Sequence, residues 1–221
     1  MNIVEIIKGQ LTSSGATSKL ASSLGMDAGD ARRASDAAIP TMLAGLAGLA
    51  GTPEGARKLN TAVDDLDDSE DPVASLSSGG GRFIDKGGSM LSSLFGGGML
   101  SSIASVLSKF TGMGSGQITS LLGGLGPIVL GVLKGQKKSL GLDAGGLANM
   151  LSGQKSNIAG AMPAGLSGAL GSVPGLSGLG DWMKGAGAKA TGAADDAADW
   201  AKETGGRAVD RTREMAGSAY D

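Results

Sequence analysis

The run Asp64–Asp71 places six carboxylates within eight residues, so it is the first place to look for metal chemistry. A calcium loop of the EF-hand type needs oxygen ligands at alternating positions, a central glycine and a terminal glutamate at a fixed spacing. This run has none of that register. We interpret it as the solvated end of a helix that leads into a flexible linker, and we predict no metal site.

Side chains suited to catalysis are scarce. The chain has no His and no Cys, which removes the commonest general base, the thiolate nucleophile and the commonest metal ligands. Ser115 lies between two glycines, but no strand pattern precedes it as a nucleophile elbow requires. The glycine clusters at 79–81, 96–98 and 123–124 lack the spacing and the lysine of a phosphate loop. We therefore predict a protein that is not an enzyme, with no cofactor and no small-molecule substrate.

Two tryptophans in the last forty or so residues are the best candidates for contact anchors. Asp181-Trp182-Met183-Lys184 recurs as Asp199-Trp200-Ala201-Lys202, a spacing of 18 residues. At about 3.6 residues per turn, this spacing puts both rings on one face of a continuous helix. Several glycines weaken such a helix, so we predict a marginal amphipathic tail over residues 181–221. Trp182 and Trp200 then contact either a partner or the protein's own body.

The elements that precede this tail come in two similar copies. Gly25-Met26, Pro40 and Gly48 align with Gly112-Met113, Pro127 and Gly135, always 87 residues apart. Glycine and proline restrict backbone geometry, so their repetition predicts a repeated backbone path. We expect Gly25 to close a short helix in the left-handed conformation, and each proline to bend or split a longer helix.

The expected organisation follows from this repeat. Helical unit one covers residues 1–66, and an acidic and Ser/Gly linker covers residues 67–87. Helical unit two covers residues 88–155, with a stripe that runs from Met99 to Phe110 and a four-residue insertion between Gly135 and Asp143 that we assign to a loop. A Gly/Ala/Pro linker follows at residues 156–180. We predict an all-α protein in which the two units pack as a helical bundle.

Small residues on the two longer helices suggest close helix approach. Gly124, Gly131 and Gly135 lie on one such face, and only six residues of the whole chain are aromatic. A core without aromatics buries modest area, so each unit alone is marginal and gains by packing with the other or with further molecules. We expect a self-associating homo-oligomer, with unit two at the centre of the assembly and unit one nearer its surface.

Two other functions remain open. Residues 87–108 and 111–133 carry no charged side chain, which suggests a membrane-surface or envelope-associated module as an alternative function. Within residues 111–133, the glycines and the one-sided apolar pattern favour a buried core helix over a membrane span. The turn at Gly25-Met26 resembles a helix-turn-helix. However, the following helix begins with acidic residues and the net charge is −2, so nucleic acid is an unfavourable partner. No signal peptide is recognisable at the N-terminus, and we expect a cytoplasmic protein.

The turn, proline and glycine pattern, the segment 141–151 (Gly-Leu-Asp-Ala-Gly-Gly-Leu-Ala-Asn-Met-Leu) and the start Met-Asn-Ile-Val-Glu-Ile-Ile resemble a known group. The chain resembles the bacterial domain-of-unknown-function family 937, related to the YidB-type helical proteins, over about residues 1–155. This resemblance implies an all-helical bacterial protein with a homeodomain-like helix arrangement and no established activity. It assigns no functional residues. The expected function is therefore that of a structural or scaffold protein that forms a polymer or other higher-order assembly.

Overall fold

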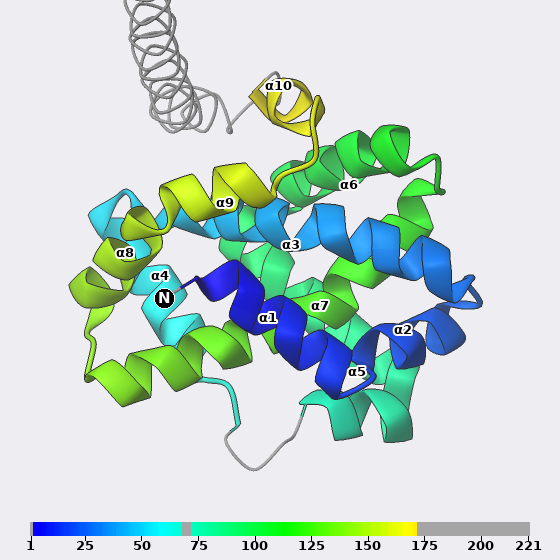
Figure 1. Ribbon diagram of the computed structural model, residues 1–221. Helices are drawn as coiled ribbons and strands as arrows, with labels where there is room; N and C mark the ends of the chain where they lie inside the picture. The colour runs from blue at the N-terminus through cyan, green and yellow to red at the C-terminus, as the bar shows by residue number, and fades with distance from the viewer. Residues whose placement is uncertain (1, 68–71, 172–221) are drawn as a thin grey trace, which may run out of the picture. The chain divides into compact units, whose positions relative to one another are not determined.

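The computed structural model describes residues 2–67 and 72–171, and this part of the chain is helical with no strand (Figure 1). The helices are α1 (Ile3–Ser13), α2 (Ala16–Leu24), α3 (Ala28–Ala50), α4 (Pro53–Asp64), α5 (Pro72–Phe95), α6 (Gly97–Thr111), α7 (Ser115–Leu140), α8 (Ala144–Gly153), α9 (Lys155–Ala161) and α10 (Leu166–Gly171). The predicted all-α class is confirmed. Trp182, Trp200 and the whole predicted tail lie outside the described residues.

The long helices of the two units begin at the 87-residue offset that the sequence shows, and the helices after them begin at a larger offset. Helix α3 begins at Ala28 and α7 begins 87 residues later, while α4 and α8 begin 91 residues apart. Side-chain caps define three of these starts. The carboxylate of Asp27 accepts the N–H of Gly29 at 2.8 Å, Thr52 caps α4, and the carboxylate of Asp143 accepts the N–H of Gly146 at 2.7 Å. Each cap satisfies an N–H that has no partner inside the helix, which sets where the helix begins.

The long helices α3 and α7 are buried on every side around their prolines. Residues 37–47 of α3 and 121–130 of α7 form uninterrupted buried runs, with Pro40 and Pro127 inside them. Both helices continue through the proline, so the expected split does not occur. The one-sided pattern expected from the sequence holds only near the helix ends. A helix that is apolar all round belongs in the centre of a domain, and here two such helices occupy it.

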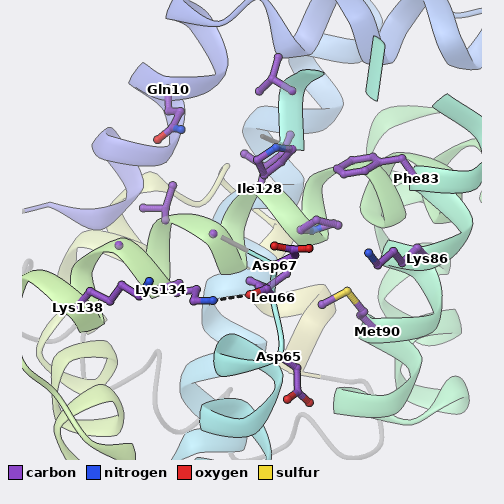
Figure 2. Close-up of a pocket in the computed structure, with 16 residues that line it drawn as sticks. Gln10, Asp65, Leu66, Asp67, Phe83, Lys86, Met90, Ile128, Lys134 and Lys138 are labelled. Carbon is purple, nitrogen blue, oxygen red and sulfur yellow. Dashed lines mark hydrogen bonds between the residues drawn. The ribbon is translucent and has the colours of Figure 1, made fainter. Parts of the chain in front are cut away.

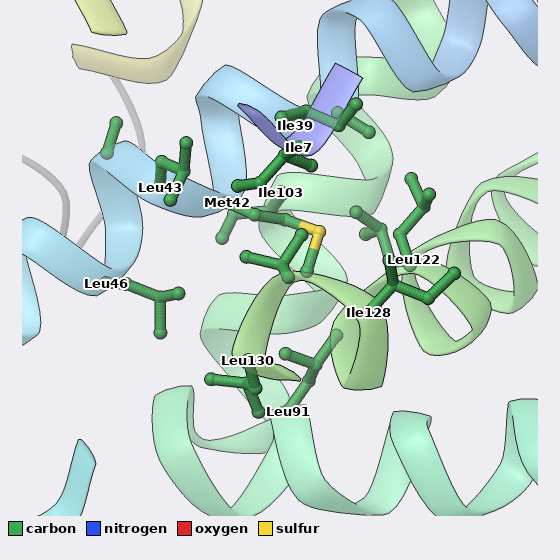
Figure 3. Packing of buried hydrophobic residues seen from close by; sticks show 14 of the residues in the cluster. Ile7, Ile39, Met42, Leu43, Leu46, Leu91, Ile103, Leu122, Ile128 and Leu130 are labelled. Carbon is green, nitrogen blue, oxygen red and sulfur yellow. The ribbon is translucent and has the colours of Figure 1, made fainter. Parts of the chain in front are cut away.

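One hydrophobic core joins the two sequence units. Figure 3 shows Met42 and Leu46 of α3 in the same cluster as Leu122 and Ile128 of α7, with Leu91 of α5 beside them. The cluster extends from Ile3 in α1 to Leu170 in α10. Within this chain α3 is therefore as central as α7, and unit one is not a peripheral layer. The expected order of the two units in an assembly stays a prediction.

Glycines bring α5 into backbone contact with α7. A Cβ on Gly87 would lie 1.9 Å from the carbonyl oxygen of Gly123, and a Cβ on Gly123 would lie 2.5 Å from the carbonyl oxygen of Ile84. Neither distance allows a side chain. The close approach buries α7 between α5 and the helices of unit one, so these glycines fix the distance between two central elements.

The predicted linker at residues 67–87 is wrong over most of its length, because α5 begins at Pro72. The Ser/Gly run lies inside this helix, which packs against α2 and α7. A Cβ on Gly80 would lie only 2.9 Å from the hydroxyl of Ser23 in α2. Small residues serve here for close packing, and packing outweighs the low helix propensity of glycine. Similarly, α9 and α10 occupy part of the linker expected at residues 156–180.

Most of the four-residue insertion of unit two lengthens a helix and does not form the expected loop: α7 has 26 residues and α3 has 23, so three inserted residues are helical and one lengthens the turn that follows. Helix α7 continues to Leu140, and the chain turns only at Gly141, which has φ of 61°. Three residues are slightly less than one helical turn of about 3.6 residues, so the insertion extends α7 by almost one turn. The extension adds Lys138 beside Lys134 and Lys137 at this end of the helix.

Helix α7 is also the one described helix that is long and apolar enough to cross a membrane, with a mean hydropathy of 1.5. In the fold, 72% of that apolar window is buried among other helices. Helices α5 and α6 pass the same test only as a pair, and they are bent by 112° at the break between them. Packing inside the bundle accounts for the apolar character of α7, as the sequence favoured.

Candidate functional site: a lysine-lined pocket and a weakly charged helical face

A pocket of about 270 Å³ lies between the connection after α4, helix α5 and helix α7 (Figure 2). Phe83 and Met90 from α5 and Ile128 from α7 give it an apolar wall. Three of the residues singled out in the sequence, Pro127, Gly131 and Gly135, line it as well. Gly131 and Gly135 thus leave open space beside α7 at this point.

Lys134 is the most unusual residue of this pocket. It is only 8% exposed, and its ammonium donates to the backbone carbonyl oxygens of Asp64, at 3.3 Å, and of Leu66. These carbonyls belong to the end of α4 and the residues just after it, where the helix dipole is negative and the last carbonyls lack intrahelical partners. Lys134 therefore caps the C-terminus of α4 from a different helix.

A second contact strengthens this junction. Lys137, one turn further along α7, forms an ion pair with the carboxylate of Asp64, and its side chain is 14% exposed. The amide of Asn60 donates to the other carboxylate oxygen of Asp64 at 2.8 Å. Asp64 is thereby held by two neighbours, and α4 is clamped to α7 across about 70 residues of sequence.

Charges of both signs surround the pocket. Lys86 and Lys138 lie on its edge, and Asp65 and Asp67 lie nearby (Figure 2). No group of three or more acidic side chains that could hold a metal occurs within the described residues. Opposite charges in proximity suit a structural clamp better than a binding site for a ligand of one charge. We interpret the pocket as part of the contact that holds residues 65–67, directly after α4, against α7.

A different surface lies at the hairpin of α6 and α7. We define the α6–α7 face by exposed residues along α6, in the turn and at the start of α7: Ser101, Ser105, Lys109, Phe110, Gly112, Gly114, Ser115, Gly116, Gln117 and Thr119. Lys109 is the one charged residue in the sequence between 87 and 133. The face is therefore broad, consists mostly of residues with small side chains, and is nearly uncharged.

Phe110 stands on this face with 44% of its surface exposed. Phe110 is the last residue of the stripe that begins at Met99, and it is exposed although Ile103 and Leu107 of the same stripe are buried. Leu140, at the far end of α7, is the other strongly exposed large apolar residue of the described part, at 59%. Aromatic side chains are common anchors where proteins contact each other, which makes Phe110 a candidate for such a role.

The residues chosen from the sequence have different roles. Gly25 and Gly112 end α2 and α6 in the left-handed conformation, with φ of 61° and 76°. Pro40 and Pro127 are buried within continuous helices. Gly124 packs against Leu20 of α2, since a Cβ at position 124 would lie 2.2 Å from the Leu20 side chain. Gly124 is thus committed to packing within the chain, and of the three predicted interaction glycines only Gly135 is exposed.

Sequence reasoning missed Lys134 and misplaced Phe110. Lys134 had a usable signal, because it follows Leu130 and Leu133 on the apolar side of a helix, where a charge needs a buried partner. Nothing in the sequence signalled that Phe110 is exposed, since its spacing continues the apolar stripe and its exposure depends on where the turn lies.

Comparisons with known proteins add one result. No curated protein and no solved structure matches the chain. The model of the family described as "Bacterial protein of unknown function (DUF937)" matches residues 5–136, which include the cores of both units and the α6–α7 face. The chain belongs to this bacterial family of unknown function.

Proposed function

We propose that the protein is a non-enzymatic, self-associating helical scaffold of the bacterial cytoplasm, and that the α6–α7 face is its contact surface. The exposure of Phe110 within a nearly uncharged surface carries this proposal. A phenyl ring supplies apolar area. Burial of the surrounding serines and glycines costs little side-chain conformational entropy. With a single lysine on the face, few charges must be desolvated when two copies meet.

The proposed partner is a second copy of the same chain. Two positively or negatively charged surfaces of one kind repel each other, whereas a surface with one charge can face its own copy at little electrostatic cost. A contact of this face with itself closes as a dimer. Growth into a polymer requires a second surface, and Trp182 and Trp200 are the residues to test for it.

Sedimentation velocity of the full chain over a range of concentrations tests the proposal. The wild-type chain is expected to increase in mass with concentration. Phe110→Glu is expected to weaken association by roughly tenfold or more, because the central aromatic anchor is lost and like charges meet across the contact.

Leu140→Glu is the matched control. It makes the same kind of change at a side chain that is even more exposed but lies outside the α6–α7 face. The control is expected to associate like the wild-type chain. A wild-type chain that stays monomeric at all concentrations, or equal weakening by both substitutions, would overturn the proposal.

Two other functions have less support. A membrane-surface or envelope-associated module would draw on the nearly uncharged stretches, but 72% of the apolar window of α7 is buried in the fold and is not presented to a membrane. For DNA binding, Arg33 near the start of α3 pairs with Asp30, and residues 37–47 are buried. Flotation with anionic liposomes and a gel shift at low salt would reveal either activity.

A further inference from the structure

A groove lies beside the α6–α7 face, where α5, α6 and α7 meet. Its volume is about 450 Å³, and all three helices contribute to its lining. We call it the Asp85 groove and define it by its lining residues: Ile84, Asp85, Gly88, Ser89, Ser92, Leu100, Thr119 and Ser120. Thr119 also belongs to the α6–α7 face, so the groove and the face are continuous.

The Asp85 groove has room for a side chain of another molecule. A Cβ on Gly88 would have no heavy atom within 4 Å, so the space beside this residue is open. Ile84 and Leu100 are buried and give the groove its apolar part. A cavity of about 150 Å³ is enough to hold a benzene ring. The volume of the groove therefore accommodates the phenyl ring of a phenylalanine.

The groove and the α6–α7 face each carry one charged residue, and the two charges are opposite. Asp85 is the one charged residue in the lining of the groove, since Arg82 and Lys86 on the same helix do not line it. Lys109 is the one charged residue of the face. Among the residues that the structure describes, neither Asp85 nor Lys109 has an ion-pair partner. Both charges are thus available for a contact between copies of the chain.

The first repeat shows what contacts this end of a helical hairpin. Ser23 in α2 is the counterpart of Phe110, because the two residues are 87 positions apart. Ser23 lies against α5, where a Cβ on Gly80 would be 2.9 Å from its hydroxyl oxygen. Phe110 is 44% exposed instead. The Asp85 groove of a second copy, with Gly88 of α5 in its lining, offers Phe110 a contact of the same kind.

We propose that Lys109 and Phe110 of one copy dock into the Asp85 groove of a second copy, where the ammonium of Lys109 pairs with the carboxylate of Asp85. This inference rests on the proposed self-association and specifies how the two copies meet. The contact is reciprocal, so a dimer contains it twice. The pairing also offsets the repulsion between the lysines that two facing copies bring together.

Charge exchange between two variants of the full chain tests the pairing by sedimentation velocity. Asp85→Lys alone and Lys109→Glu alone each place like charges at both contacts of a homodimer, so each is expected to weaken association by roughly tenfold. Both residues are exposed, so neither change disturbs the core. In an equimolar mixture, a heterodimer pairs the natural Lys109 with the natural Asp85 and the two introduced charges with each other. The mixture is therefore expected to associate within about threefold of the wild-type chain.

Lys19→Glu is the matched control, because it makes the same change at an exposed lysine of α2 that belongs to neither the face nor the groove. It should associate like the wild-type chain, and it should not restore the association of Asp85→Lys in a mixture. If Phe110→Glu weakens association but the mixture of Asp85→Lys and Lys109→Glu associates no better than either variant alone, the docking contact is wrong and the self-association stands. A wild-type chain that stays monomeric overturns both.

Discussion

Gly87 decides how closely α5 can approach α7. A Cβ at this position would meet the Gly123 carbonyl oxygen at 1.9 Å and the Pro127 ring at 2.7 Å, and backbone atoms cannot move aside without shifting a helix. Gly87→Ala is therefore expected to lower the free energy of unfolding by about 3 kcal/mol, the upper part of the range for overpacked cores. Urea unfolding followed by circular dichroism measures this change.

The neighbouring residue provides a control for that prediction. A Cβ on Gly88 in the same helix has no heavy atom within 4 Å. Gly88→Ala should raise the free energy of unfolding by up to about 1 kcal/mol, because alanine favours the helix. If both substitutions change stability in the same direction and by similar amounts, the proposed close contact is absent.

At the scale of elements, the sequence contains good information about where helices begin and end. The left-handed end at Gly25 was predicted, and the caps Asp27, Thr52 and Asp143 are of the same local kind, because each depends on a few adjacent residues. The start of α5 could not be predicted in this way. Its Ser/Gly run is a poor helix former, and only contact with α2 and α7 keeps it helical.

The clamp between α4 and α7 shows the same limit. The sequence contains Lys134, but it does not show that the end of α4 lies opposite, 68 to 70 residues away. Sites formed by one segment were predictable, whereas sites formed between segments required the fold.

Lys134→Met tests the clamp. Methionine keeps the apolar stem but leaves the carbonyls of Asp64 and Leu66 without their ammonium donor. We expect a loss of about 2 kcal/mol in the free energy of unfolding, which is typical for unsatisfied buried groups. Thermal unfolding with the full chain measures it.

Lys58→Met serves as the comparison, because Lys58 pairs with Glu54 at 3.3 Å on the exposed side of α4. Surface pairs of this kind contribute between about 0 and 1 kcal/mol. An effect of Lys134→Met no larger than that of Lys58→Met would show that the clamp does not stabilise the junction.

For the part of the molecule that the structure describes, the central result is one hydrophobic core that joins residues from α1 to α10. Buried runs of α3 and α7 lie together, and their partners come from both sequence units (Figure 3). The core has few aromatic side chains, so it depends on the close approach that small residues allow. Of the three glycines that suggested contacts between molecules, Gly124 is used for packing inside the chain, and the α6–α7 face is the proposed contact surface.

The most direct test of self-association uses the absence of cysteine from the natural chain. Ser105→Cys places one thiol on the α6–α7 face, and Ser139→Cys places one at the exposed far end of α7. With a short bis-maleimide cross-linker, the account predicts covalent dimers from Ser105→Cys and monomers from Ser139→Cys. Equal cross-linking of the two variants, or none with Ser105→Cys at concentrations where the chain associates, would contradict it.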